Sequence, residues 1–163
     1  MDYVGGFIGA FGGGRGGQPD GGPQGLPLIR PPWGRVTAID LNSGEHLWMV
    51  PNGDTPDFVK NHPALKGLTI PKTGQPGRAG VLVTKTLLFV TEGNGLYASP
   101  PGAGGKMLRA YDKRTGETVA ELRLPSAGGA LPMTYMVNNR QYIALAVGGQ
   151  SEPAELVALA VAQ

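Results

Sequence analysis

Apolar positions in this chain gather in short runs that alternate with turn-forming residues. Residues 35–41, 46–50, 81–84 and 87–91 are rich in Val, Ile, Leu and Thr, and Gly, Pro, Asn, Asp or Ser border each run. Runs of this length and composition predict β-strands. The only helical signal is a single turn at 64–67, ended by its glycine. The same pattern predicts hairpins over 107–124 and 132–147 and a last strand over 156–161, which makes about nine strands.

The outer strand of the hairpin at 107–124 shows a period of two. Thr118, Ala120 and Leu122 fall on one face, and Val119 and Glu121 fall on the other. A strand of this kind is expected to bury one face and to expose the other to water. Residues 138–139, two asparagines, are expected to form the tight turn of the next hairpin, because Asn tolerates left-handed backbone.

One strand-turn-strand unit occurs twice. Residues 35–48 and 109–120 share an Asp-x-x-x-Gly-Glu turn, from Asp40 to Glu45 in the first copy and again 72 residues later. The aspartates and glycines are typical turn residues, so both carboxylates are interpreted as turn-forming groups. An internal repeat of this kind is typical of modular β architectures such as propellers. Chance recurrence of one common turn is the alternative.

The first copy, from Ala38 to Trp48, resembles the tryptophan-docking repeat of the quinoprotein dehydrogenases, which use pyrroloquinoline quinone (PQQ). Residues 131–135, 140–144 and 148–149 resemble the carboxy-terminal end of the glucose-dehydrogenase-like branch of that family. The resemblance covers roughly residues 26–163. It implies that Trp48 packs between neighbouring blades of a propeller. Ala120 stands at the matching position of the second copy, so the contact between that blade and its neighbour must be made differently.

The resemblance implies an all-β fold, a partial β-propeller of about two and a quarter four-stranded blades out of an eight-bladed ring. Grouped in fours, the predicted strands form half of one blade at 35–50, a whole blade at 79–124, and three strands of another at 132–161. In the family, a strand from the far amino terminus completes the last blade. We therefore expect a carboxy-terminal fragment with open edges and low stability on its own.

Two segments differ in composition. Residues 1–32 are dense in Gly and Pro and are expected to be a flexible lead-in, or a long loop held by a larger fold, whereas 33–163 carries the blades. Residues 12–17 match Gly-x-Gly-x-x-Gly. Without a preceding strand or a following helix, the interpretation of this motif as a dinucleotide-binding site is weak.

Residues 51–78 form a long connection in which five prolines oppose strand pairing.

Composition and charge argue against several classes of protein. The chain has 163 residues, no cysteine and a net charge of +2 without a basic cluster, so disulfides are excluded and nucleic acid is not an expected partner. No apolar run has the roughly 18 residues that a transmembrane helix needs. The amino terminus does not resemble a secretory signal. Because the family is periplasmic, we expect the chain to be the tail of a longer protein.

The resemblance implies PQQ held with Ca²⁺ on the propeller axis, and an Asp that takes the proton while hydride passes to the quinone. No segment here matches the part of the family that supplies this base or the calcium ligands. No catalytic residue and no metal ligand are therefore expected in this chain, and both are expected upstream of residue 1.

Five residues are candidates to face the cofactor or the substrate. Thr91, Glu92 and Asn94 follow an inner strand, where relatives place polar residues near the axis; a solvated turn is the alternative. Met133 and Thr134 resemble the family's Pro-Met-Thr-Tyr segment, where a strand starts near the axis; plain strand packing is the alternative.

Two other positions bear on the chemistry. His62, alone in the long connection, is interpreted as an ordinary surface residue. Gln150 stands where many relatives have a His that faces the substrate, which weakens the case for glucose.

The sequence therefore favours the carboxy-terminal part of a PQQ-dependent dehydrogenase that oxidises a sugar or other alcohol and passes electrons to a respiratory acceptor. One alternative is a non-catalytic propeller that uses the same repeat as a scaffold. A further alternative is a short β domain that stands alone.

Overall fold

The computed structural model describes residues 23–27, 29–93, 104–149 and 152–161. This part of the chain contains nine strands and three short helical turns, which confirms the all-β prediction. The turns are η1 (Pro23–Gly25), α1 (Asp57–Lys60) and η2 (Pro63–Leu65). The strands are β1 (Arg35–Ile39), β2 (His46–Pro51), β3 (Val81–Val83), β4 (Leu87–Thr91), β5 (Met107–Asp112), β6 (Thr118–Arg123), β7 (Met133–Val137), β8 (Arg140–Gly149) and β9 (Glu152–Ala160).

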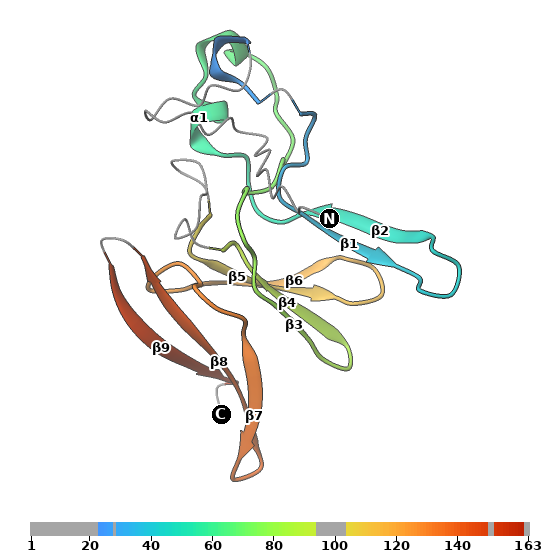
Figure 1. Ribbon diagram of the computed structural model, residues 1–163, viewed down its shortest axis with the longest axis vertical. Coiled ribbons are helices and arrows are strands. Elements are labelled where there is room, and N and C mark those ends of the chain that lie inside the picture. Colours follow the sequence, from blue (N-terminus) through green and yellow to red (C-terminus); the bar gives the residue numbers. More distant parts are fainter. Residues whose placement is uncertain (1–22, 28, 94–103, 150–151, 162–163) are drawn as a thin grey trace, which may run out of the picture.

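The strands form three antiparallel sheets that follow one another along the chain. Their orders are β1-β2, β3-β4-β5-β6 and β7-β8-β9, as the grouping of two, four and three strands predicted. In Figure 1 the β1–β2 hairpin and the third sheet lie on opposite sides of the middle sheet. The long connection and the segment that precedes β1 gather at one end of the sheets.

The two copies of the repeat have the same turn. One carboxylate oxygen of Asp40 accepts the N–H of the second residue after it at 2.8 Å, and Asp112 makes the same contact at 2.8 Å. The N–H of Gly44 donates to the carbonyl of Asp40 at 2.7 Å, and that of Gly116 donates to Asp112 at 2.9 Å. The predicted turn-forming role of both aspartates is confirmed.

The two copies also have the same strand register. Ala38 pairs with Trp48, and Ala110 pairs with Ala120. In each hairpin the register shifts immediately after that alanine. A shared irregularity at a fixed repeat position shows that the two hairpins are equivalent structural units.

Trp48 joins the first sheet to the middle sheet. Its ring packs against a buried core that includes Leu88, Val90 and Tyr111. Its indole N–H donates to the carbonyl of Lys113 at 3.2 Å. A Cβ at Gly116 would lie 2.6 Å from the ring, so the indole rests directly on the backbone of the second copy's turn. The expected packing of Trp48 between blades is confirmed.

Replacing Gly116 with Ala is expected to lower the free energy of unfolding by about 2 kcal/mol. The backbone φ of +74° costs an L-residue roughly 1 kcal/mol, and the new methyl group also collides with the Trp48 ring. Gly44→Ala is the matched control, because Gly44 has φ +75° but no described atom within 4 Å of a Cβ at that position. Urea denaturation checks both variants. Equal losses would show that the contact with Trp48 contributes nothing.

A second core joins the middle sheet to the third sheet. Leu108, Leu124, Leu145 and Val147 are buried there, and Phe89 packs against them. The segment between β6 and β7 runs beside β8, with an isolated bridge between Gly128 and Val147. The middle sheet therefore has apolar contacts on both faces, as an internal blade of a propeller requires.

The predictions for β6 and β9 need correction. All six residues of β6 are exposed, although only one face was expected to be wet. β6 is the outermost strand of the middle sheet. The third sheet has only three strands among the described residues, so no fourth strand covers β6. β9 starts at Glu152 rather than at 156. Pro153 is tolerated because β9, among the described residues, pairs only with β8 and has no described strand at its other edge.

The turns are predicted more accurately than the helices. Asn138 and Asn139 have φ of 48° and 60°, which confirms the left-handed turn between β7 and β8. The helical turn expected at 64–67 lies slightly earlier, at η2 (Pro63–Leu65), and Gly67 follows it with φ +83°. α1 was not expected, because four residues are too few for a periodic pattern.

His62 holds the long connection against the segment that precedes β1. Its Nδ1 accepts the N–H of Ala64 at 3.2 Å, so its Nε2 donates to the carbonyl of Gln24 at 2.8 Å. Both ring nitrogens are thus used by the backbone, which supports the interpretation of His62 as an ordinary residue.

Candidate functional site

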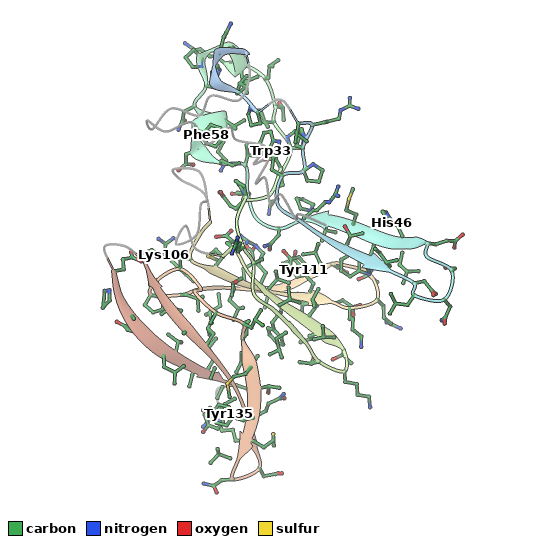
Figure 2. The ribbon with its side chains drawn as sticks, viewed as in Figure 1. Trp33, His46, Phe58, Lys106, Tyr111 and Tyr135 are labelled. Atoms are coloured by element: carbon green, nitrogen blue, oxygen red, sulfur yellow. The ribbon has the colours of Figure 1, made fainter. Side chains whose placement is uncertain are left out.

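Polar side chains are buried where the long connection meets the middle sheet. β4 ends and β5 begins at this place, since Thr91 pairs with Leu108. We call Asn52, Thr91, Glu92, Arg109 and Tyr111 the buried polar cluster. All five residues are buried, three of them in the middle sheet's own strands. Figure 2 shows Tyr111 between the β1–β2 hairpin and the middle sheet.

Arg109 is the charged centre of the cluster. Its Nη1 donates to Oε1 of Glu92 at 2.6 Å, and its Nε donates to Oε1 of Glu121 at 2.6 Å. The side chains of Arg109 and Glu92 are only 8% and 7% exposed, whereas that of Glu121 is 41% exposed. The guanidinium is therefore held between one buried carboxylate and one that water reaches.

The charges of the cluster shift two pKa values. Burial opposes the charged form of Arg109, yet its hydrogen bonds to Glu121 and Glu92 and the charge of Glu92 outweigh burial and raise the pKa of the guanidinium. Burial also raises the pKa of Tyr111 to about 12, against the opposing effect of the Arg109 cation. Arg109 is thus a permanent cation, and Tyr111 a neutral phenol, at physiological pH.

A chain of hydrogen bonds links the first sheet to the middle sheet. The hydroxyl of Tyr111 donates to Oδ1 of Asn52 at 3.0 Å. The amide Nδ2 of Asn52 donates to the carbonyl of Thr91 at 2.9 Å. The N–H of Gly80 donates to Oγ1 of Thr91 at 2.8 Å. Buried polar groups are stable only when they are satisfied in this way.

Glycines enclose the carboxylate of Glu92. A Cβ at Gly105 would lie 1.8 Å from Oε2 of Glu92, and a Cβ at Gly53 would lie 2.7 Å from Oε1. The N–H of Met107 donates to Oε2 at 3.3 Å. Next to Gly53 lies Gln75, whose Oε1 is buried without a hydrogen-bond partner among the described residues. The backbone therefore packs tightly around this ion pair.

The structure places the predicted cofactor-facing residues as follows. Thr91 and Glu92 lie in the buried polar cluster. Met133 is 57% exposed at the start of β7. Thr134 is exposed, and its hydroxyl donates to the carbonyl of Tyr142 at 2.9 Å. Asn94 lies outside the described residues, as does Gln150.

Thr91 and Glu92 lie on the middle sheet, and Met133 and Thr134 lie on the neighbouring third sheet. Gly80 connects the two places. Its N–H donates to Thr91, and a Cβ added at Gly80 would lie 2.7 Å from the carbonyl oxygen of Ala130, in the segment that leads into β7. Contact of these residues with a cofactor stays a prediction. Sequence reasoning missed Arg109 and Asn52, and the only signal for Arg109 was a charge inside an apolar strand.

A second polar group, the Glu152 clamp, ties the middle sheet to the third sheet. Glu152 accepts hydrogen bonds from the ammonium group of Lys106 and the hydroxyl of Ser126. Lys106 also donates to the carbonyl of Pro125 at 3.3 Å. Figure 2 shows Lys106 where β5 begins, beside the upper end of the third sheet. The bonds to Lys106 and then Ser126 lower the pKa of Glu152.

Acid is expected to weaken this clamp. Because the pKa of Glu152 is lower in the folded chain, its contribution to stability is present above the ordinary value of 4.5 and is lost as the pH falls through the lowered pKa. Urea denaturation at neutral pH and below pH 4.5 should therefore show a smaller acid-induced loss in Glu152→Gln than in the wild type. Glu155→Gln, an exposed position on the same strand, is the control. Equal losses in all three proteins would contradict the prediction.

The described residues do not by themselves form the site that PQQ and Ca²⁺ would need. Ca²⁺ takes several carboxylate or carbonyl oxygens. No three His, Cys, Asp or Glu side chains in the described ranges come together as a metal site. The carboxylate of Glu92 is bound by Arg109, and the hydroxyl of Thr134 is bound by Tyr142 and Gln141. We therefore derive no chemical step through either group.

Comparisons with known proteins agree with the repeat and the sheets. Residues 14–143 match the family described as "PQQ: Glucose/ethanol/alcohol dehydrogenase, beta-propeller domain". The chain is 35% identical over 125 residues to quinoprotein glucose dehydrogenase A of Acinetobacter calcoaceticus, covering 76% of this chain and 14% of that protein. It is 37% identical over 122 residues to the glycerol dehydrogenase large subunit of Gluconobacter thailandicus, covering 74% of this chain and 15% of that protein.

A solved structure shows the same fold. The quinohemoprotein alcohol dehydrogenase from Comamonas testosteroni aligns with a TM-score of 0.55 and 23% identity, over 84% of this chain and 18% of that chain.

The repeated hairpins, the docked tryptophan and the successive antiparallel sheets define a segment of a β-propeller of the quinoprotein class. The chain belongs to the PQQ-dependent glucose/ethanol/alcohol dehydrogenase family. It spans about one seventh of the length of the curated relatives it matches. No helix within the described ranges is long and apolar enough to cross a membrane.

Proposed function

We propose that the chain is the carboxy-terminal part of a longer PQQ-dependent dehydrogenase, which oxidises a sugar or another alcohol by hydride transfer to the quinone. The observation that supports this most strongly is the family match over residues 14–143. Relatives named for glucose and for glycerol support a sugar or another alcohol as the substrate class. The dehydrogenase function is favoured over a scaffold, because these named relatives are dehydrogenases.

In this proposal the chain forms part of the edge of the cofactor site and supports it structurally, and it does not supply the reacting groups. Met133 and Thr134 form an edge that faces the cofactor or substrate. The buried polar cluster holds the end of β4, and with it Thr91 and Glu92, against the middle of the ring. Ca²⁺ and the general base are supplied mainly by the upstream part, electrons go to a respiratory acceptor, and the protein works in the periplasm.

The proposal also explains why no aromatic ring among the described residues packs on the turn at Gly44. The equivalent turn of the second copy carries the ring of Trp48 on Gly116, whereas no described atom lies within 4 Å of a Cβ at Gly44. A preceding blade of the same type would place its own aromatic ring there. The apolar side chains of Leu47 and Met49, exposed on β2, would be covered by the same blade.

Activity measurements on the purified 163-residue chain test this division of labour. With PQQ, Ca²⁺ and a panel of sugars and alcohols, we expect no reduction of an artificial dye, because the base and the calcium ligands are not expected in this chain. Dye reduction by the chain alone would refute it. A known quinoprotein glucose dehydrogenase in the same assay is the positive control.

A further inference from the structure

Residues 77–79, which we call the channel segment, lie at the end of the middle sheet that holds the buried polar cluster. All three residues are exposed, whereas Gly80, which follows them, is buried. The segment leads into β3, the edge strand of the sheet on the side away from β6. The sheets of a propeller surround a central channel. Since β6 is the outermost strand, β3 is the strand next to that channel, and the channel segment lies at its mouth.

The backbone at the end of β4 supports the channel segment directly. A Cβ at Gly77 would lie 2.7 Å from the carbonyl oxygen of Glu92. A Cβ at Gly93, whose φ is +79°, would collide with the carbonyl group of Arg78. The two stretches of backbone therefore touch without a side chain between them, and the position of one sets the position of the other.

Two hydrogen bonds fix the place where the channel segment joins β3. The N–H of Gly80 donates to Oγ1 of Thr91 at 2.8 Å, and the N–H of Thr91 donates to the carbonyl of Gly80 at 3.0 Å. Thr91 thus uses its hydroxyl and its backbone on the same neighbour. The segment can move only if the end of β4 moves with it.

Arg109 holds the end of β4 through the side chain of Glu92. Because its guanidinium also binds Glu121, it ties the end of β4 to β5 and β6. Thr91 and Glu92 are only 0% and 6% exposed. Groups covered so completely by this chain's own atoms have no surface left for a cofactor or a substrate, and further blades of a propeller can only cover them more.

We propose that Arg109 is a positioning residue that acts through Glu92 on the channel segment, and that residues 77–79 are the part of this end that contacts the substrate. This inference rests on the proposed dehydrogenase function. It assigns Thr91 and Glu92, which the sequence predicted to face the cofactor or the substrate, to the support of their exposed neighbours. The segment includes Arg78, whose guanidinium carries several N–H donors, and the hydroxyl oxygens of a sugar or an alcohol accept hydrogen bonds from such groups.

The KM of the full-length protein that carries this chain tests the proposal, because KM does not depend on how much of the protein is folded. Gly93→Ala displaces the channel segment through its collision with Arg78 and should raise the KM for the sugar or alcohol at least about tenfold. Gly116→Ala is the matched control. Gly116 has φ +74°, and its Cβ collides with Trp48 at the opposite end of the middle sheet. This variant should leave KM within about twofold of the wild type.

Variants of Arg109 separate positioning from a purely structural role. Arg109→Gln should raise KM as Gly93→Ala does, because it releases Glu92. Arg109→Lys, which keeps a positive charge beside Glu92, should restore part of the wild-type KM. Leu145→Ala removes a buried side chain from the second core, so it should lower stability without changing KM.

Maleimide labelling of the full-length protein, followed by mass spectrometry of its peptides, gives a readout that does not depend on activity. Ala79→Cys should react, because residue 79 is exposed. Thr91→Cys should stay unlabelled in the folded protein, because Thr91 is buried. Saturating substrate should slow the labelling of Ala79→Cys, as expected for a residue that the substrate covers.

An unchanged KM in Gly93→Ala, or equal changes in Gly93→Ala and Gly116→Ala, would overturn the proposal and leave the proposed function intact. Rapid labelling of Thr91→Cys, or labelling of Ala79→Cys that substrate does not slow, would do the same. A full-length wild type that oxidises no sugar or alcohol with PQQ and Ca²⁺ would refute the proposed function, and this inference with it. If Gly93→Ala does not fold, Ala79→Phe should raise KM, with Lys85→Phe in the exposed turn between β3 and β4 as its control.

Discussion

Glu92→Gln is expected to lower the free energy of unfolding by about 3 kcal/mol, the cost of removing one partner of a buried ion pair. Arg109 stays charged and buried in this variant, with a neutral amide where its buried carboxylate was. Gly53 and Gly105 pack closely on the site and leave little room for water to compensate. Urea denaturation followed by circular dichroism measures the loss.

Glu121→Gln is the matched control for this prediction. Glu121 binds the same guanidinium at the same distance, 2.6 Å, but its side chain is 41% exposed. An exposed ion pair contributes at most about 1 kcal/mol, so this variant should lose far less. Similar losses from the two variants would show that burial does not decide the strength of the Arg109 contacts.

Trp48→Ala is expected to cost about 3 kcal/mol, because it empties the contact between the first sheet and the middle sheet. The ring packs on the core around Tyr111, and its N–H bonds to Lys113. Trp48→Phe should restore part of the packing but not the hydrogen bond, which is worth about 1 kcal/mol. The same denaturation assay applies.

Leu47→Ala is the control for Trp48. Leu47 is the neighbouring residue on β2, points to the opposite face and is 63% exposed. Its loss should change stability by no more than about 0.5 kcal/mol. If both alanine variants lost the same amount, Trp48 would not be the residue that joins the two sheets.

The strand order and the turns could be predicted because their signals are local. Asp40 and Asp112 bond to backbone groups two residues away, and Asn138 with Asn139 adopts a conformation that few other residues tolerate. The repeat of 72 residues then groups the strands into sheets. Such contacts need no knowledge of distant parts of the chain.

The buried polar cluster could not be predicted, because its partners meet only after folding. Glu92 and Arg109 come together through the register of β4 and β5, and Asn52 arrives from the far end of another sheet. Thr91 and Glu92 were selected for their place after an inner strand. Their place in a buried network depends on the long connection, whose course the prolines do not specify.

The contact at Ala120 lies between these cases. The departure from the repeat at Ala120 is visible in the sequence and indicates that the second contact differs from the first. The way in which the third sheet packs beside Ala120 depends on distant contacts, which local signals do not determine.

The mass of the native protein tests the central claim most directly. An antibody against residues 109–147 should detect, in cells that make this protein, a band several-fold above the 16.9 kDa of the chain, because the aligned 76% of this chain covers only 14% of a matched family member, which is therefore about five times as long. Protein captured with that antibody should reduce dye with an alcohol or a sugar when PQQ and Ca²⁺ are added. A band at 16.9 kDa without such activity would contradict the assignment of this chain to a complete dehydrogenase propeller.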